Sequence, residues 1–188
     1  MIIIQQEVTT VVFKLIWGIL LFIAILAHAW FRGKLIHKGG IIANLLVVVP
    51  YLAVFGWFSV RDYIGTFRVN IITQIFGIMI VILGVSGYIV SILYLRRNWT
   101  VSAAIKEGHT LVKDGPYRFV RHPMYFFMTL VVFGSGLLVS NFLIILYTPV
   151  VAFLYYLRSK KEEEMLIKAL PGYTRYMKES KMLIPGVF

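Results

Sequence analysis

The stretch from Pro123 to Leu157 contains 35 residues and no charged side chain. As one straight helix it would be about 52 Å long, whereas the hydrocarbon core of a bilayer is only about 30 Å thick. The stretch therefore has to reverse direction, and Ser140–Asn141 is the only polar pair near its middle. We predict a membrane-embedded helical hairpin whose two arms are at the lower limit of length for a span.

Three further apolar stretches precede the hairpin, and each is long enough for one membrane helix. They cover residues 11–31, 41–60 and 69–95. Apolar residues make up 60% of the chain and charged residues only 14%, whereas soluble domains have about 45–50% and about 25%. A soluble protein of this composition lacks the polar side chains needed to cover its core. The predicted fold class is therefore all-α, an integral membrane bundle of about five transmembrane helices.

The basic residues indicate how this bundle is oriented. Of the lysines and arginines, 16 fall on the side of the membrane that carries residues 96–122 and 158–188, and three fall on the other side. Basic loops usually face the cytoplasm, so we expect the N-terminus outside and the C-terminus in the cytoplasm. A charged membrane face also explains the net charge of +11 without a nucleic acid partner.

This arrangement divides the chain into two parts. Residues 1–95 would form three membrane helices, and residues 96–188 would form the functional half. Within that half we expect a cytoplasmic loop, the helical hairpin and a cytoplasmic tail, at residues 96–122, 123–157 and 158–188. The loop is rich in turn-forming residues, and the tail continues the last span as a helix until Pro171–Gly172 ends it. Nearly all polar groups able to do chemistry are therefore expected on the cytoplasmic face.

The densest cluster of such groups runs from Gly115 to Tyr125 and reads Gly-Pro-Tyr-Arg-Phe-Val-Arg-His-Pro-Met-Tyr. Pro123 fits the first position of a helix, which puts His122 at the helix entrance. Free backbone N–H groups and the positive end of the helix dipole favour an anionic ligand group there. A basic, aromatic belt at the membrane interface has the same composition, so on composition alone both interpretations stay open.

A second cluster consists of three consecutive glutamates, Glu162–Glu164. They spread over about 200° of the helix circumference, so some can face inward while others stay in water. Arg158 lies four residues before Glu162 and can form an ordinary i,i+4 ion pair with it. The location directly after a membrane helix, among many basic residues, also suits the binding of a cation or an ammonium group.

A third, weaker signal is His109, which is either a ligand contact or a loop histidine. The four histidines have no spacing typical of metal ligands and the chain has no cysteine, so we expect no metal site. Neither a phosphate-binding glycine loop nor a nucleophile elbow is present in the sequence.

In their order along the chain, the three clusters resemble the isoprenylcysteine carboxyl methyltransferase family and its phospholipid methyltransferase relatives. The resemblance covers about residues 96–188. The matching elements are His109–Val112, Gly115–Tyr117, Arg121–Tyr125, Glu162–Glu164, and Gly172 with Tyr176.

The resemblance implies an S-adenosylmethionine-dependent enzyme in the membrane that methylates the carboxylate of a lipophilic acceptor, such as a prenylated cysteine. It implies that Arg158 is catalytic and orients that carboxylate. The cofactor pocket would lie between the 96–122 loop and the C-terminal helical tail. Its implied residues are His109, Thr110, Leu111, Val112, Tyr117, His122, Pro123, Met124, Tyr125 and Glu163. The expected partners are a lipid-like or prenylated substrate and the bilayer, with no metal and no nucleic acid.

The chemistry of carboxyl methylation is compatible with these residues. A carboxylate is already ionised at neutral pH and needs no general base, and a water-poor site favours the meeting of an anion with a sulfonium. The nearest alternative is a phospholipid or amine N-methyltransferase, which requires a base to accept a proton. A nicotinamide-dependent membrane reductase is another alternative. A non-catalytic scaffold or transporter is the third, although transporters usually carry ionisable groups at mid-membrane depth.

Overall fold

The computed structural model describes residues 70–100 and 104–184, the strand at 35–38, and isolated positions in 11–19 and at 65 and 67. The predicted spans at residues 11–31 and 41–60 lie outside the described residues, apart from a few positions of the first. Within the described part the protein is mostly helical.

Helix α3 (Ile71–Leu95) corresponds to the third predicted span. Asn70 caps its start, because the side-chain oxygen accepts a hydrogen bond of 2.9 Å from the backbone N–H of Ile72. The helix continues into the short 3₁₀ helix η1 (Arg96–Asn98). Among the described helices, two are long and apolar enough to cross a membrane, and they occupy residues 71–98 and 142–169.

The charge-free stretch forms α4 (Pro123–Leu138) and the first part of α5 (Phe142–Ala169). The chain reverses direction at residues 139–141. Asn141 caps α5 by accepting hydrogen bonds from the backbone N–H groups of Leu143 and Ile144, at 3.0 and 3.3 Å. Because α5 continues well beyond its apolar part, the glutamate cluster lies on the same continuous helix as the last predicted span.

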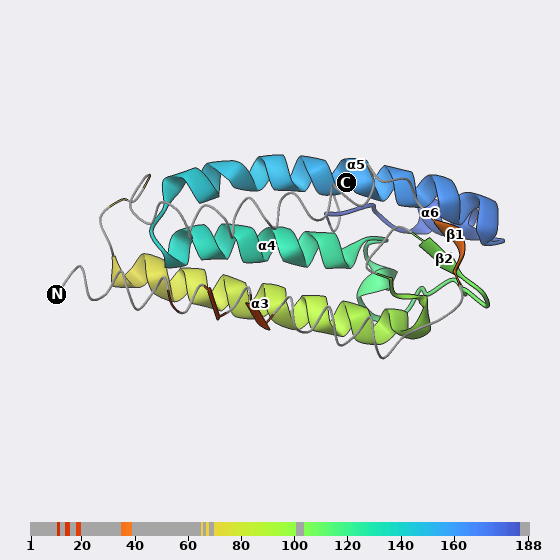
Figure 1. The fold of residues 1–188 in the computed structure, drawn as a ribbon, viewed down its shortest axis with the longest axis horizontal. Coiled ribbons are helices and arrows are strands. Elements are labelled where there is room, and N and C mark those ends of the chain that lie inside the picture. The colour runs from red at the N-terminus through yellow and green to blue at the C-terminus, as the bar shows by residue number, and fades with distance from the viewer. Residues whose placement is uncertain are drawn as a thin grey trace.

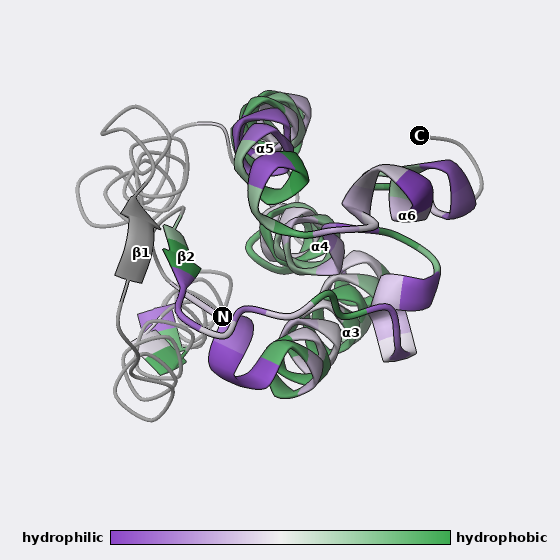
Figure 2. Ribbon diagram, turned by 90° about the vertical axis from the view of Figure 1, so that its right-hand side faces the viewer, coloured by the Kyte–Doolittle hydropathy of each residue, from purple (hydrophilic) through white to green (hydrophobic). Residues whose placement is uncertain are grey.

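Helices α3, α4 and α5 run side by side, with α4 between the other two (Figures 1 and 2). Helices α3 and α4 approach each other closely, since a Cβ atom added at Gly77 would lie 2.8 Å from the carbonyl oxygen of Gly134. Small residues permit such backbone contact between membrane helices. The core cluster is formed by Tyr88, Ile92, Trp99, Val131, Val132, Val139, Ile144, Val151 and Tyr155.

The remaining elements gather at one end of the bundle (Figure 1). They are the 3₁₀ helix η2 (Gly115–Arg118), helix α6 (Tyr173–Glu179) and the antiparallel strands β1 (Leu35–Lys38) and β2 (Ala104–Lys106). Viewed onto this end, hydrophilic residues are visible on α6, on the near turns of α5 and on the segment at the end of α3 (Figure 2). We call it the polar end.

The small sheet is a departure from the all-α prediction. All three residues of β2 are buried, and buried backbone N–H and C=O groups need partners, which the pairing with β1 supplies. A strand of three residues is too short for its period to be recognised in a sequence. The 96–122 segment, expected to be irregular, is therefore partly regular.

Candidate functional site

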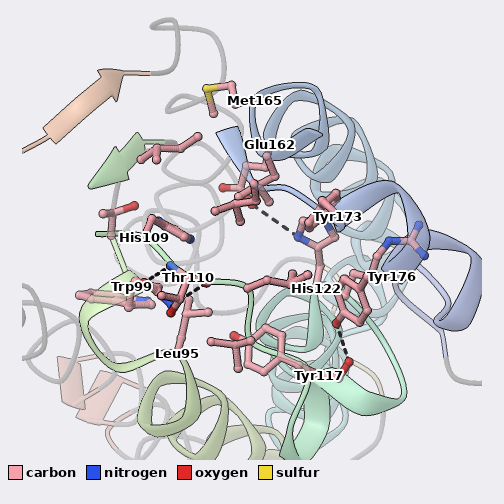
Figure 3. Close-up of a pocket in the computed structure, with 18 of the residues that line it drawn as sticks. Leu95, Trp99, His109, Thr110, Tyr117, His122, Glu162, Met165, Tyr173 and Tyr176 are labelled. Carbon is pink, nitrogen blue, oxygen red and sulfur yellow. Dashed lines mark hydrogen bonds and ion pairs between the residues drawn. The ribbon is translucent and has the colours of Figure 1, made fainter. Parts of the chain in front are cut away.

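A cavity opens at the polar end of the bundle, between the end of α3, the segment that leads to α4, and helices α5 and α6 (Figure 3). Both segments expected to be cytoplasmic contribute to its wall. Of the residues implied by the resemblance, those that line the cavity are His109, Thr110, Leu111, Val112, Tyr117, His122, Met124 and Tyr125. Pro123, Arg158 and Glu163 are buried and are not among the lining residues, whereas Glu162 is.

One wall of the cavity is held together by Asn98. Its side-chain nitrogen donates to the backbone oxygen of Thr110 at 2.9 Å, and its side-chain oxygen accepts from the Thr110 N–H at 3.2 Å. The buried Lys106 amine donates to the backbone oxygen of Trp99 at 2.7 Å. These bonds fix Asn98 and Trp99 against the end of β2 and the residues that follow it.

His122 lies between two carboxylates. Its Nδ1 is 3.5 Å from Glu162 Oε2 and its Nε2 is 3.3 Å from Glu163 Oε1. Burial lowers the pKa of His122, but the hydrogen bonds and charges of Glu162 and Glu163 outweigh burial, so the net pKa is raised above its usual value. Both ring nitrogens face glutamate oxygens, and this arrangement favours the cationic form of the imidazole.

Arg121 connects α5 to the C-terminal segment. Its Nε donates to Glu163 Oε1 at 2.6 Å, and both side chains are less than a tenth exposed. Its Nη1 donates to the backbone oxygens of Met177, at 3.1 Å, and Ser180. Glu163 thus pairs with both Arg121 and His122, and the Arg121 side chain itself forms part of the cavity wall.

Arg158 forms a second set of hydrogen bonds beside the cavity. It is 1% exposed, and its Nε donates to the Tyr125 hydroxyl at 3.1 Å and to Glu162 Oε1 at 2.8 Å. The Tyr125 hydroxyl also donates to Glu162 Oε1, at 2.7 Å. The predicted i,i+4 pair is thus present, and it fixes the carboxylate of Glu162 at the cavity wall.

Helix α6 closes the side of the cavity opposite Trp99 and His109 (Figure 3). Tyr173 and Tyr176 are buried there, and the Tyr176 hydroxyl donates to the backbone oxygen of Tyr117. Burial raises the pKa of Tyr176 to about 12, so it remains a neutral donor. The segment after α6 is fixed as well, because the backbone N–H of Arg121 donates to the backbone oxygen of Lys181 at 2.8 Å.

Sequence reasoning did not single out several residues of this wall. A tryptophan at a membrane interface is common, so Trp99 gave no signal, and nothing in the sequence distinguished Asn98 or Tyr173. Arg121 belongs to the matched motif, but its link to α6 depends on how the tail folds back. Among the described residues, no group of three or more histidines, aspartates or glutamates is arranged to hold a metal ion.

Comparison with known proteins gives a match to one family model and matches among solved structures. The sequence model of the isoprenylcysteine carboxyl methyltransferase (ICMT) family matches residues 77–168. Among solved structures, the eukaryotic intramembrane Ras methyltransferase ICMT is similar, with a TM-score of 0.56 and 22% sequence identity. That match covers 77% of this chain and 52% of the other, so the chain spans about half the length of that protein, and the similarity concerns the fold. No curated protein sequence matches the chain.

Proposed function

Because the chain belongs to the isoprenylcysteine carboxyl methyltransferase family, we propose that it transfers a methyl group from S-adenosylmethionine to the carboxylate of a lipophilic acceptor, such as a prenylated cysteine. The observation that carries this proposal is the cavity at the polar end. It combines the Glu162 carboxylate with aromatic and aliphatic walls, directly beside helices long and apolar enough to cross a membrane. We place this end on the cytoplasmic side, following the distribution of basic residues.

The donor set of the cavity fits S-adenosylmethionine. When bound, this molecule supplies an electrophilic methyl group on a sulfonium, together with an ammonium, a carboxylate and an adenine. Glu162 offers a carboxylate to the ammonium group. Arg121 and the positive end of the α4 dipole offer positive charge to the carboxylate. The apolar side chains of Leu111 and Val112 suit the adenine ring.

The state of His122 favours a carboxylate acceptor over an amine. A primary or secondary amine has to lose a proton on methylation, and an imidazole that already holds its proton between Glu162 and Glu163 is a poor base. Methylation of a carboxylate moves no proton. What the chain then has to provide is alignment and exclusion of water.

Arg158 stays part of this machinery as a positioning residue. Its guanidinium donates to Tyr125 and Glu162, and it lies behind the residues that line the cavity. By holding both groups, Arg158 fixes their positions in the cavity wall, near the point where the apolar part of α5 ends. The resemblance also implied direct contact with the acceptor carboxylate, which would require the side chain to turn toward the cavity.

The direct test is transfer of labelled methyl groups in bilayers, offering a prenylated cysteine and phosphatidylethanolamine in parallel. A methyl ester releases labelled methanol in mild base, whereas an N-methyl group is stable. We expect base-labile label on the prenylated cysteine. Base-stable label on the phospholipid would instead establish the N-methyltransferase alternative, and no transfer to either acceptor would contradict the proposal.

A further inference from the structure

Two buried polar atoms of the cavity wall have no hydrogen-bond partner among the described residues. They are Nε1 of Trp99 and Nδ1 of His109. Both side chains line the cavity, and Trp99 is only 3% exposed. Leaving a buried polar group unpaired costs about 1–3 kcal/mol, so a pair of such atoms at one place in a cavity indicates a ligand that satisfies them.

The two side chains occupy the same wall. Trp99 directly follows Asn98, and His109 directly precedes Thr110, and these two neighbours are joined by reciprocal hydrogen bonds. The Trp99 backbone oxygen is held in addition by Lys106. In Figure 3, Trp99 and His109 lie together on the side of the cavity away from His122, Tyr173 and Tyr176. Their spacing is therefore set by the fold and does not depend on a ligand.

The chemistry of the pair is a donor beside an acceptor. The indole N–H of Trp99 can only donate, whereas a neutral imidazole carries one donor and one acceptor nitrogen. Burial, followed by the nearby charge of Lys106, lowers the pKa of His109, which keeps its ring neutral. Adenine presents the complementary edge, with a ring nitrogen that accepts next to an amino group that donates.

Resting on the function proposed above, we infer that Trp99 and His109 recognise the adenine of the methyl donor. Trp99 Nε1 donates to a ring nitrogen, and His109 Nδ1 accepts from the exocyclic amino group. The opposite side of the cavity, with Arg121, His122 and Glu162, then receives the amino acid part. Trp99 is accordingly a specificity-determining residue for the nucleobase.

The test compares binding of S-adenosylhomocysteine and S-inosylhomocysteine by calorimetry with the full-length protein in detergent. In the second compound a carbonyl replaces the amino group of the base, so at least one bond to the pair is lost. We expect the wild type to bind it roughly tenfold more weakly, the effect of one net hydrogen bond. Equal affinities would overturn the inference, whereas failure to bind either compound would contradict the proposed function itself.

Variants separate Trp99 from general packing. Trp99→Phe keeps an aromatic ring but removes the donor, and should weaken binding of S-adenosylhomocysteine roughly tenfold and reduce the preference for adenine. Tyr173→Phe is the matched control, since it removes a polar group from the other side of the cavity, and it should leave that preference unchanged. Unaltered affinity and preference in a folded Trp99→Phe variant would refute the role of Trp99. Should that variant fail to fold, the indole N–H resonance of the wild type decides, with a downfield shift on binding expected for one tryptophan and none contradicting the inference.

Discussion

The three consecutive glutamates occupy three different environments, and one conservative substitution at each of them tests the site in detail. Glu162 lines the cavity, Glu163 is buried against Arg121, and Glu164 is exposed and pairs only with the exposed Lys161 in the described structure. Replacing each by glutamine removes a charge and preserves the shape. The three variants should therefore differ in which property they change, the affinity for the ligand or the stability of the protein.

The expected magnitudes follow from these contacts. Glu162→Gln removes a charge-assisted hydrogen bond to the donor's ammonium group, about 1.5–3 kcal/mol, which weakens binding about 10- to 150-fold. Glu163→Gln leaves Arg121 with an uncompensated buried charge and should lower the free energy of unfolding by about 3 kcal/mol, with a smaller effect on affinity. Glu164→Gln should change either quantity by less than about 0.5 kcal/mol.

The assay measures two quantities for each variant, the affinity for S-adenosylhomocysteine by calorimetry and the thermal unfolding midpoint in detergent without ligand. We expect a large loss of affinity at Glu162, accompanied by some loss of stability because Glu162 also pairs with the buried Arg158. At Glu163 we expect a loss of stability with little loss of affinity. A large loss of affinity at Glu163 with unchanged stability would show that Glu163 binds the ammonium group. Indistinguishable results for Glu162 and Glu164 would refute the reasoning from the cavity wall.

Three further predictions concern the surrounding structure. Arg158→Ala should lower kcat by about 100-fold through misalignment while changing the affinity for S-adenosylhomocysteine much less; equal losses in both would contradict a positioning role. The raised pKa of His122 means that its protonation contributes stability fully below the unfolded pKa of about 6.5, and that this contribution is lost as pH rises through the folded pKa. The destabilisation caused by His122→Phe, measured by unfolding from acid to alkaline pH, should therefore shrink as pH rises, and a constant or growing difference would contradict the cationic state. Gly77→Ala places a Cβ 2.5 Å from the backbone nitrogen of Leu138 and should lower the unfolding midpoint by an amount corresponding to about 1–3 kcal/mol; an unchanged midpoint would argue against direct backbone contact between α3 and α4.

The course of the described helices was predictable because it depends on local and strongly constrained features. The length of the charge-free stretch requires a reversal, and Asn141 at its middle is a good helix cap. Pro123 likewise begins α4, as its fixed φ angle favours. Strand β2 was missed because its formation depends on pairing with Leu35–Lys38, far away in the sequence, and long-range pairing leaves no pattern in three residues.

The candidate site was predictable in composition but not in detail. The clusters around His109, His122 and Glu162–Glu164 do meet at one cavity. Which glutamate faces inward depends on the rotation of α5 against its neighbours, because consecutive helical residues point about 100° apart. The position of Trp99 in the cavity wall depends on the reciprocal hydrogen bonds between Asn98 and Thr110. These bonds connect the two ends of a segment that the sequence predicts to be an irregular loop.

The proposed function depends on the cavity at the polar end holding the methyl donor. Ultraviolet crosslinking of radiolabelled S-adenosylmethionine to the protein in bilayers, followed by mapping of the labelled peptides, tests this most directly. We expect label on peptides from residues 95–125 or 162–176, which contribute the cavity wall, and its loss in the presence of excess S-adenosylhomocysteine. Label confined to other parts of the chain, or label that the competitor does not displace, would contradict it.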